Sequence, residues 1–405
     1  MTAARIGPNA AIPLRYANRH GLVTGPTGTG KTVTLMTLIE SLAQAGVSVI
    51  APDTKCDLSA LARSCNVTHL QPLTGPGAPC RVPVWALGAD LLSRALELTD
   101  AQSGALEIAF AFADETGQPL DTLADFRALL ASLAASPDSV AHLGHVTRAS
   151  VGTIQRALLR LEAQGAGVMF GAPGYDVESA MAPGLVSILD VSQLYHSPRL
   201  YGALMLYLLR DLARRLPELG DMDKPRLCLV IDESHCLFHE ASPALLRSIE
   251  ATARLIRSKG VGLYFASQSP DDIPAIVRDQ CATTIAHSRD LGVGRAAFRT
   301  LDASGNATES RIIRPDLPQC PLGPLSEAER AAMSERAAMS QPVATPETVQ
   351  GQDMTAHGYA FLLVAGIALC GLAYGLNAAL ATWGAGGCIA VAFGAWLALR
   401  GKTPT

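Results

Sequence analysis

Residues 25–32 read Gly-Pro-Thr-Gly-Thr-Gly-Lys-Thr, a complete phosphate-binding loop of the pattern G-x-x-x-x-G-K-[ST]. The apolar segment 21–24 precedes the loop, and residues 31–46 follow it with apolar side chains at helical spacing. A strand, a glycine-rich loop and a helix in this order let backbone N–H groups and the start of the helix surround a phosphate group. The sequence therefore predicts nucleotide binding; an ordinary turn rich in glycine and threonine is the alternative.

The residue types of the loop assign each position a part in that binding. Glycines allow backbone angles and a close approach that a Cβ atom would block. Lys31 supplies positive charge to the β- and γ-phosphates, and the Thr32 hydroxyl is the expected ligand of Mg²⁺. We therefore expect ATP and Mg²⁺ at this loop, with the nucleotide held by Gly25, Pro26, Thr27, Gly28, Thr29, Gly30, Lys31, Thr32 and Val33.

A second, acidic motif separates a hydrolase from the other classes that use such a loop. The apolar run 227–231 suits a parallel strand buried on both faces, and it ends in Asp232-Glu233. Ligands of parallel sheets bind at such strand ends. Asp232 is expected to hold Mg²⁺, and Glu233 is expected to accept a proton from the water that attacks the γ-phosphate. The pair predicts ATP hydrolysis, and an acidic strand end without catalytic role is the alternative.

A third apolar segment, residues 262–266, runs into a polar cluster that contains Gln268. A neutral amide at this point can orient the attacking water and report the presence of the γ-phosphate. Gln268 is therefore a candidate sensor. A turn-forming cluster before Pro270 is the alternative, and it would be favoured in the absence of the other two motifs.

Four segments together resemble the HerA-like bacterial ATPases, namely residues 17–21, 52–59, 232–238 and 256–268. The resemblance extends over approximately residues 10–325 and points to the helicase HerA-like proteins of unknown function. It implies an α/β fold, that of a RecA-like P-loop NTPase of the additional-strand catalytic-glutamate type with a parallel central sheet. Relatives in the HerA/FtsK superfamily are hexamers that pull duplex DNA through a central channel, so the resemblance also implies a hexamer and duplex DNA.

The resemblance carries roles to individual residues. It gives Lys31 and Thr32 to the nucleotide and metal, Asp232 to Mg²⁺, Glu233 to catalysis as the base, and Gln268 to sensing.

The resemblance further implies an arginine finger that completes the site of a neighbouring subunit. Arg254, Arg257 and Arg289 are the candidates, and their spacing does not choose among them. Arg254 and Arg257 are three residues apart on a predicted helix and share a face, so a solvated helix face is the alternative for either one.

The sequence departs from the family at Cys56, which stands where relatives usually carry a glycine between Lys55 and Asp57. The departure weakens the expectation of a tight turn at this point. It also leaves Lys55 and Asp57 without an assigned role.

Residues 358–399 contain no charged side chain and are rich in Ala, Leu, Gly, Val and Ile. A membrane-spanning helix needs about 20 apolar residues, so this segment has room for two. Arg400 and Lys402 follow it, which predicts a C-terminus on the cytoplasmic side. We therefore predict a two-helix transmembrane hairpin that anchors the protein in the cytoplasmic (inner) membrane, with the ATPase domain facing the cytoplasm. A pair of buried helices in a soluble protein is the alternative.

The motifs divide the chain into predicted parts. A helical insertion interrupts the ATPase core, and we see no catalytic constellation in it. The parts are residues 1–84, the first half of the core; 85–165, the insertion; 166–320, the second half with the acidic motif and sensor; 321–357, a linker; 358–399, the hairpin; and 400–405, a cytoplasmic tail.

Charge bears on the substrate of the predicted ATPase. The net charge is −4 at pH 7, whereas DNA-binding domains usually present a basic surface. Six subunits could still concentrate the basic clusters 210–215 and 254–259 around a channel. One hypothesis is a membrane-anchored motor ATPase that translocates or remodels duplex DNA. The others are an ATPase that energises a protein-secretion or conjugation-like membrane apparatus through protein partners, and a slow nucleotide switch.

Overall fold

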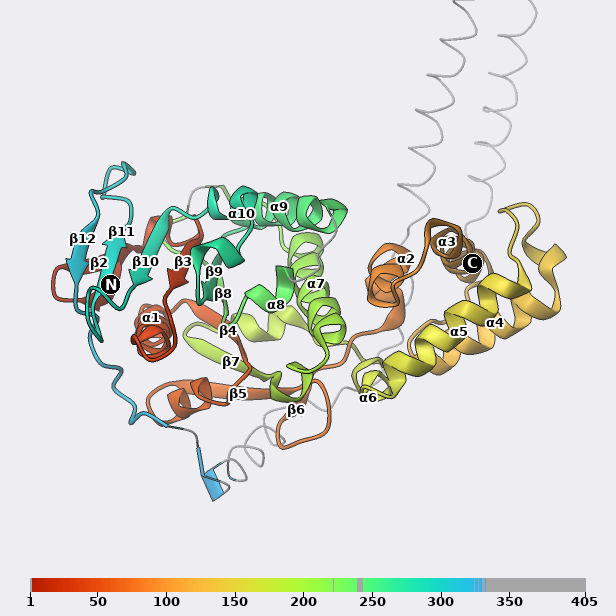
Figure 1. Cartoon of the computed structure of the whole chain (residues 1–405), viewed down its shortest axis with the longest axis horizontal. Helices are drawn as coiled ribbons and strands as arrows, with labels where there is room; N and C mark the ends of the chain where they lie inside the picture. Colours follow the sequence, from red (N-terminus) through yellow and green to blue (C-terminus); the bar gives the residue numbers. More distant parts are fainter. Residues whose placement is uncertain are drawn as a thin grey trace, which may run out of the picture. The chain divides into compact units, whose positions relative to one another are not determined.

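The computed structural model describes residues 2–220, 222–238, 243–323, 325–326, 328–329 and 332. These residues form a fold around a ten-stranded sheet (Figure 1). In sheet order the strands are β12 (Arg311–Ile313), β11 (Ala296–Arg299), β10 (Thr283–His287), β3 (Gly21–Thr24), β9 (Val261–Ser267), β8 (Leu227–Ile231), β4 (Ser48–Asp53), β7 (Leu185–Asp190), β5 (Asn66–Gln71) and β6 (Ala78–Pro79). Neighbours from β10 to β6 are parallel, whereas β11 and β12 extend the sheet in antiparallel fashion.

Both faces of the central strands are buried, as their apolar composition requires. Every residue of β8 and of β9 is buried. Adjacent residues such as Leu229 and Val230 belong to two different hydrophobic clusters, because successive side chains of a strand point to opposite faces. The sheet is therefore the middle layer of the fold.

Different elements cover the two faces. Helix α1 (Lys31–Gln44) and the hairpin of β1 (Ala3–Gly7) and β2 (Ala10–Pro13) contribute to one cluster. Helices α7 (Pro198–Arg215) and α9 (Pro243–Ser258) contribute to the other cluster. The short α8 (His235–Phe238), which precedes α9, and α10 (Ala275–Arg278), which follows β9, contribute to it as well. Figure 1 shows α1 on one side of the strands and α7 with α9 on the other.

A set of helices stands between β6 and β7 in the sequence. They are α2 (Val84–Ala95), α3 (Asp100–Thr116), α4 (Leu123–Ala135), α5 (Arg148–Glu162) and α6 (Ala166–Met169). Helix α3 begins with a capping box, in which the Thr99 backbone N–H donates to Gln102 Oε1 at 2.9 Å.

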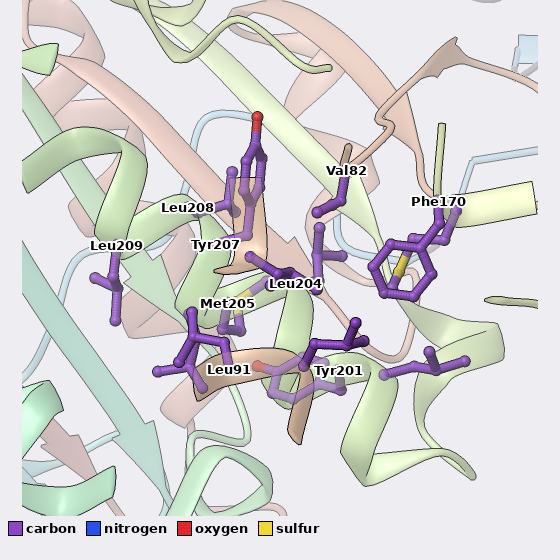
Figure 2. Close-up of a cluster of buried hydrophobic side chains, with 14 of the residues drawn as sticks. Val82, Leu91, Phe170, Tyr201, Leu204, Met205, Tyr207, Leu208 and Leu209 are labelled. Atoms are coloured by element: carbon purple, nitrogen blue, oxygen red, sulfur yellow. The ribbon is translucent and has the colours of Figure 1, made fainter. Parts of the chain in front are cut away.

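These helices pack onto α7 through an apolar cluster (Figure 2). Leu204 and Met205 of α7 meet Val82, Leu91 and Phe170 there, and all five side chains are at most 4% exposed. A large apolar side chain contributes about 1.5–3 kcal/mol when it is fully buried, so this junction fixes the added helices to the core.

The structure confirms the predicted strands at 21–24 and 227–231 and the helix that follows the glycine-rich loop. The two outer antiparallel strands, β11 and β12, were not predicted. Among the described residues, no helix has the length and apolar character needed to cross a membrane. The predicted hairpin at 358–399, the tail at 400–405 and most of the linker lie outside the described residues.

Candidate nucleotide-binding site

The glycine-rich loop joins β3 to α1 and needs its glycines for two different reasons. At Gly25, an added Cβ atom would lie 2.5 Å from His287 Cβ, so only glycine lets the loop start this close to β10. Gly30 caps the N-terminus of α1 with φ of +109°, which a residue with a side chain rarely adopts. Thr27 and Gly28 at the apex are exposed, and no atom lies within 4 Å of a Cβ built on Gly28. The apex is thus open to a ligand.

The sheet order brings the acidic motif to this loop. Strands β3 and β8 flank β9, and all three end at the same edge because they are parallel. Lys31 Nζ lies 3.7 Å from Asp232 Oδ1 and 3.6 Å from Glu233 Oε1. At most 8% of each of these side chains is exposed. The predicted lysine and carboxylates therefore form one buried cluster.

The acidic motif ends β8 in a strained turn. Glu233 has φ of +47°, in the left-handed region that non-glycine residues adopt at a cost of about 1–3 kcal/mol. Hydrogen bonds hold this turn in place: Glu233 N–H donates to Asp232 Oδ1 at 2.9 Å, and Ser234 Oγ donates to the Ala266 carbonyl at 2.8 Å. The carboxylate of Glu233 is thus fixed by the backbone as well as by its ionic neighbours.

Sequence reasoning missed a second lysine of the cluster. Lys55 Nζ donates to Glu233 Oε1 at 2.5 Å, and the Lys55 side chain is 47% exposed whereas that of Glu233 is 2% exposed. The preceding Asp53 shapes the turn, because its carboxylate accepts the N–H groups of Lys55 and Ser59 at 3.3 and 3.1 Å. The cysteine put a tight turn in doubt at this position, yet the chain bends there, and Cys56 adopts φ of +61°, the left-handed conformation that glycine favours. The family-like segment 52–59 was the available signal.

The charges of the cluster set its protonation. Burial raises the pKa of Asp232, and the nearby Lys31 opposes this effect. Burial also acts to raise the pKa of Glu233, but the hydrogen bond from Lys55 and the charges of both lysines outweigh it, so this pKa lies below its ordinary value. Glu233 is therefore ionised at neutral pH. The hydrogen bond to Glu233 in turn raises the pKa of Lys55.

Two further predicted residues lie at the same edge. Gln268 directly follows β9 and is exposed, between the ends of β3 and β8. Arg289 is also exposed and follows β10, on the side of β3 away from β8.

Arg254 and Arg257 lie at the opposite edge of the sheet, where the parallel strands begin. They belong to the last turns of α9, which leads into the start of β9. Together with Asn18, Gly220 and Ser258 they line a concavity of about 450 Å³. The structure therefore does not bring these two arginines to the site of their own subunit.

A cavity of about 470 Å³ opens beside the first turn of α1. Gly30, Val33 and Thr34 line it next to the loop, and Leu317 is an apolar residue of its lining. Thr34 Oγ1 and His287 Nε2, which also line the cavity, lie 2.9 Å apart. The cavity adjoins the glycine-rich loop on the β10 side, away from the acidic cluster.

The fold and this edge define an α/β protein of the P-loop ATPase type. A family model described as "Helicase HerA-like C-terminal" matches residues 2–72 and 67–289, and the chain belongs to this HerA-like family. The structure of VirB4 of Thermoanaerobacter pseudethanolicus is 17% identical, with a TM-score of 0.55 over 78% of this chain and 95% of that one. The bacterial conjugative coupling protein TrwBdeltaN70 is 16% identical, with a TM-score of 0.48 over 81% and 87%. No curated protein matches the sequence.

The family match confirms the resemblance to HerA-like ATPases, and the likeness to VirB4 shows a shared fold. The prediction of an α/β fold with a mostly parallel central sheet, as in RecA-like P-loop ATPases, is confirmed.

Proposed function

We propose that this protein is a motor ATPase that couples ATP hydrolysis to translocation or remodelling of duplex DNA and works as a homo-hexamer. The observation that carries the ATPase part is the buried cluster of Lys31, Asp232 and Glu233 beside an open glycine-rich loop. Buried charges are costly unless they are paired or bind a ligand, and such clusters concentrate at functional sites. Membership of the HerA-like family supports the motor part.

The sheet order gives the proposed nucleotide a direction. Asp232 and Glu233 mark the end where the γ-phosphate is attacked, because these carboxylates lie beside Lys31. The nucleoside end then faces the cavity next to His287, on the other side of β3. The position of β9 between β3 and β8 supports the additional-strand catalytic-glutamate class.

The roles of the residues follow from this direction. Residues 25–33 hold the phosphates through backbone N–H groups, and Lys31 adds the positive charge. Thr32 and Asp232 would hold Mg²⁺, which neutralises charge on the phosphates. Glu233 accepts the proton of the attacking water, and Gln268 orients that water.

An arginine from a neighbouring subunit would complete the site. Arg254, Arg257 and Arg289 remain the candidates; the first two lie away from the site of their own subunit, at the opposite edge of the sheet, so they could act only in trans.

A protein-directed ATPase of a secretion or conjugation-like membrane apparatus is the second candidate function. The net charge of −4 favours it, since it is unlike the basic balance of a DNA-binding surface. Both candidates include an anchor in the inner membrane through residues 358–399, which rests on the uncharged stretch of sequence.

ATP turnover by the full chain, measured with and without duplex DNA, tests the proposal. Glu233→Gln should lower kcat by about 10²–10⁴-fold, the usual contribution of a general base. Stimulation by DNA that vanishes in this variant supports the DNA motor. Turnover that is indifferent to DNA favours the protein-directed ATPase, and turnover that survives the substitution contradicts the assigned site.

A further inference from the structure

We infer that Lys55 is a brake on hydrolysis: it restrains Glu233 by occupying Oε1, the oxygen that must accept the proton of the attacking water. This inference rests on the proposed ATPase function and deepens it. In the restrained step, the water oxygen forms a bond to the γ-phosphorus, the bond to the ADP oxygen breaks, and the water proton passes to Glu233. Lys55 is thus a positioning residue that acts through the catalytic base.

The two oxygens of Glu233 differ in what they can do. Oε2 is buried and has no hydrogen-bond partner among the described residues; His235 Nδ1 lies 3.3 Å from it without forming a hydrogen bond. Oε1 receives the Lys55 ammonium at 2.5 Å, with Lys31 at 3.6 Å. Lys31, the lysine assigned to the β- and γ-phosphates, lies beside Oε1, so Oε1 is the oxygen directed at the phosphate site, and Lys55 already holds it.

Both ends of the contact are built by the backbone. Glu233 and Cys56 adopt left-handed conformations, with φ of +47° and +61°, in turns that follow the neighbouring strands β8 and β4. The carboxylate of Asp53 holds the turn that contains Lys55, because it accepts the backbone N–H groups of Lys55 and Ser59. Strain of this kind persists where the surrounding structure enforces it, and it clusters at functional sites.

The two partners differ in their freedom to separate. Glu233 is 2% exposed and held by its turn, whereas nearly half of the Lys55 side chain faces solvent. Lys55 can therefore swing away while Glu233 stays in place. When Lys31 engages the phosphates, Lys55 becomes the main cation on Glu233, and its departure sets the fraction of time in which Oε1 is available to water.

Basal ATP turnover by the full chain, without DNA, tests the brake. Lys55→Met should raise kcat about 3–10-fold, the rate effect of releasing a partly exposed ion pair, and leave KM within about twofold. Lys55→Arg keeps the ion pair and should turn over like the wild type. Lys224→Met is the matched control, since this lysine is also exposed and donates hydrogen bonds to the carbonyls of Ala45 and Gly46, not to a carboxylate. The double variant of Lys55→Met with Glu233→Gln should be inactive.

An unfolding cycle tests the contact independently of activity. Without nucleotide, the urea midpoints of Lys55→Met, Glu233→Gln and the double variant should be non-additive; with a non-hydrolysable ATP analogue and Mg²⁺ they should become closer to additive. A fall or no change in kcat for Lys55→Met, or additive midpoints without nucleotide, would overturn the brake. Wild-type protein without turnover would refute the ATPase instead, while the unfolding cycle would still decide on Lys55.

Discussion

Two groups of charged side chains, one at each edge of the central sheet, differ in how deeply they are buried. At the edge of the glycine-rich loop, Lys31, Asp232 and Glu233 are almost completely buried and touch one another. At the other edge, Arg254 is 63% exposed and pairs with Glu250 one helical turn away. A buried cluster depends on each of its members, whereas an exposed ion pair contributes little. We infer that the charges at the first edge carry function and that Arg254 at the second mainly contacts solvent.

At the opposite edge, the buried titratable group His20 is neutral. His20 is 2% exposed; its Nε2 lies 3.0 Å from the Ala253 carbonyl, and its Nδ1 accepts the N–H of Leu263 at 3.0 Å. Burial lowers the pKa of His20 to about 4, and the nearby Arg257 acts in the same direction. Here a buried polar side chain ties α9 to β3 and β9, so it serves the fold.

The largest effect should come from the loop edge. Lys31→Ala removes the buried cation and leaves Asp232 and Glu233 without it, so ATP affinity should fall about 100-fold or more, as expected for the loss of charge-assisted contacts. Isothermal titration with ATP and Mg²⁺ measures this. Arg254→Ala at the other edge is the control and should bind ATP like the wild type; equal losses in both variants would contradict the distinction between the edges.

The next effect concerns stability at the opposite edge. His20 is neutral in the folded protein down to about pH 4, whereas the unfolded chain binds a proton below the ordinary pKa of 6.5. The unfolded state thus binds more protons between these values, so stability should fall by about 3 kcal/mol as the pH drops from 6.5 to 4. His20→Asn suits the left-handed backbone at this position, where φ is +55°, and it should remove most of this dependence.

Urea unfolding at several pH values compares the wild type with His20→Asn. Burial raises the pKa of Asp53 to about 7, which acts in the opposite sense over the same range in both proteins. The difference between the two curves is therefore the test. Parallel curves would show that His20 is not the acid-sensitive group.

The comparison also explains what the sequence could predict. The glycine-rich loop and the run 227–233 have a local geometry that their residue types dictate, so both strands and the helix after the loop were predicted correctly. The contact of Lys55 with Glu233 was not, because it joins residues 178 apart and depends on β4 lying next to β8. Spacing likewise could not place Arg254, since the course of α9 back to the start of β9 puts it at the far edge.

A smaller effect should come from the turn that aims Lys55. Cys56→Gly removes a side chain from a backbone with φ of +61°, so it should stabilise the protein by about 0.5–1 kcal/mol. Basal turnover should stay unchanged, because the Lys55 contact is kept. Cys65→Gly is the matched control: Cys65 is also a half-buried cysteine, but its φ is not positive, so glycine should destabilise there. A loss of stability in Cys56→Gly would show that the turn is unstrained.

The smallest effect should come from the exposed pair at the opposite edge. Arg254→Ala breaks an i,i+4 contact with Glu250, and such pairs are worth about 0.3–0.5 kcal/mol, so urea unfolding should hardly change. If Arg254 serves a neighbouring subunit, kcat of the assembled protein should nevertheless fall while ATP affinity is kept, because the residue is remote from its own loop. Adding Arg254→Ala subunits to Glu233→Gln subunits separates these cases: a site that combines an intact glutamate with an arginine from the other variant regains turnover. If kcat is unchanged in Arg254→Ala alone, this arginine does not act in the site of a neighbouring subunit. Arg257 and Arg289 would then be the candidates for the arginine supplied by that subunit.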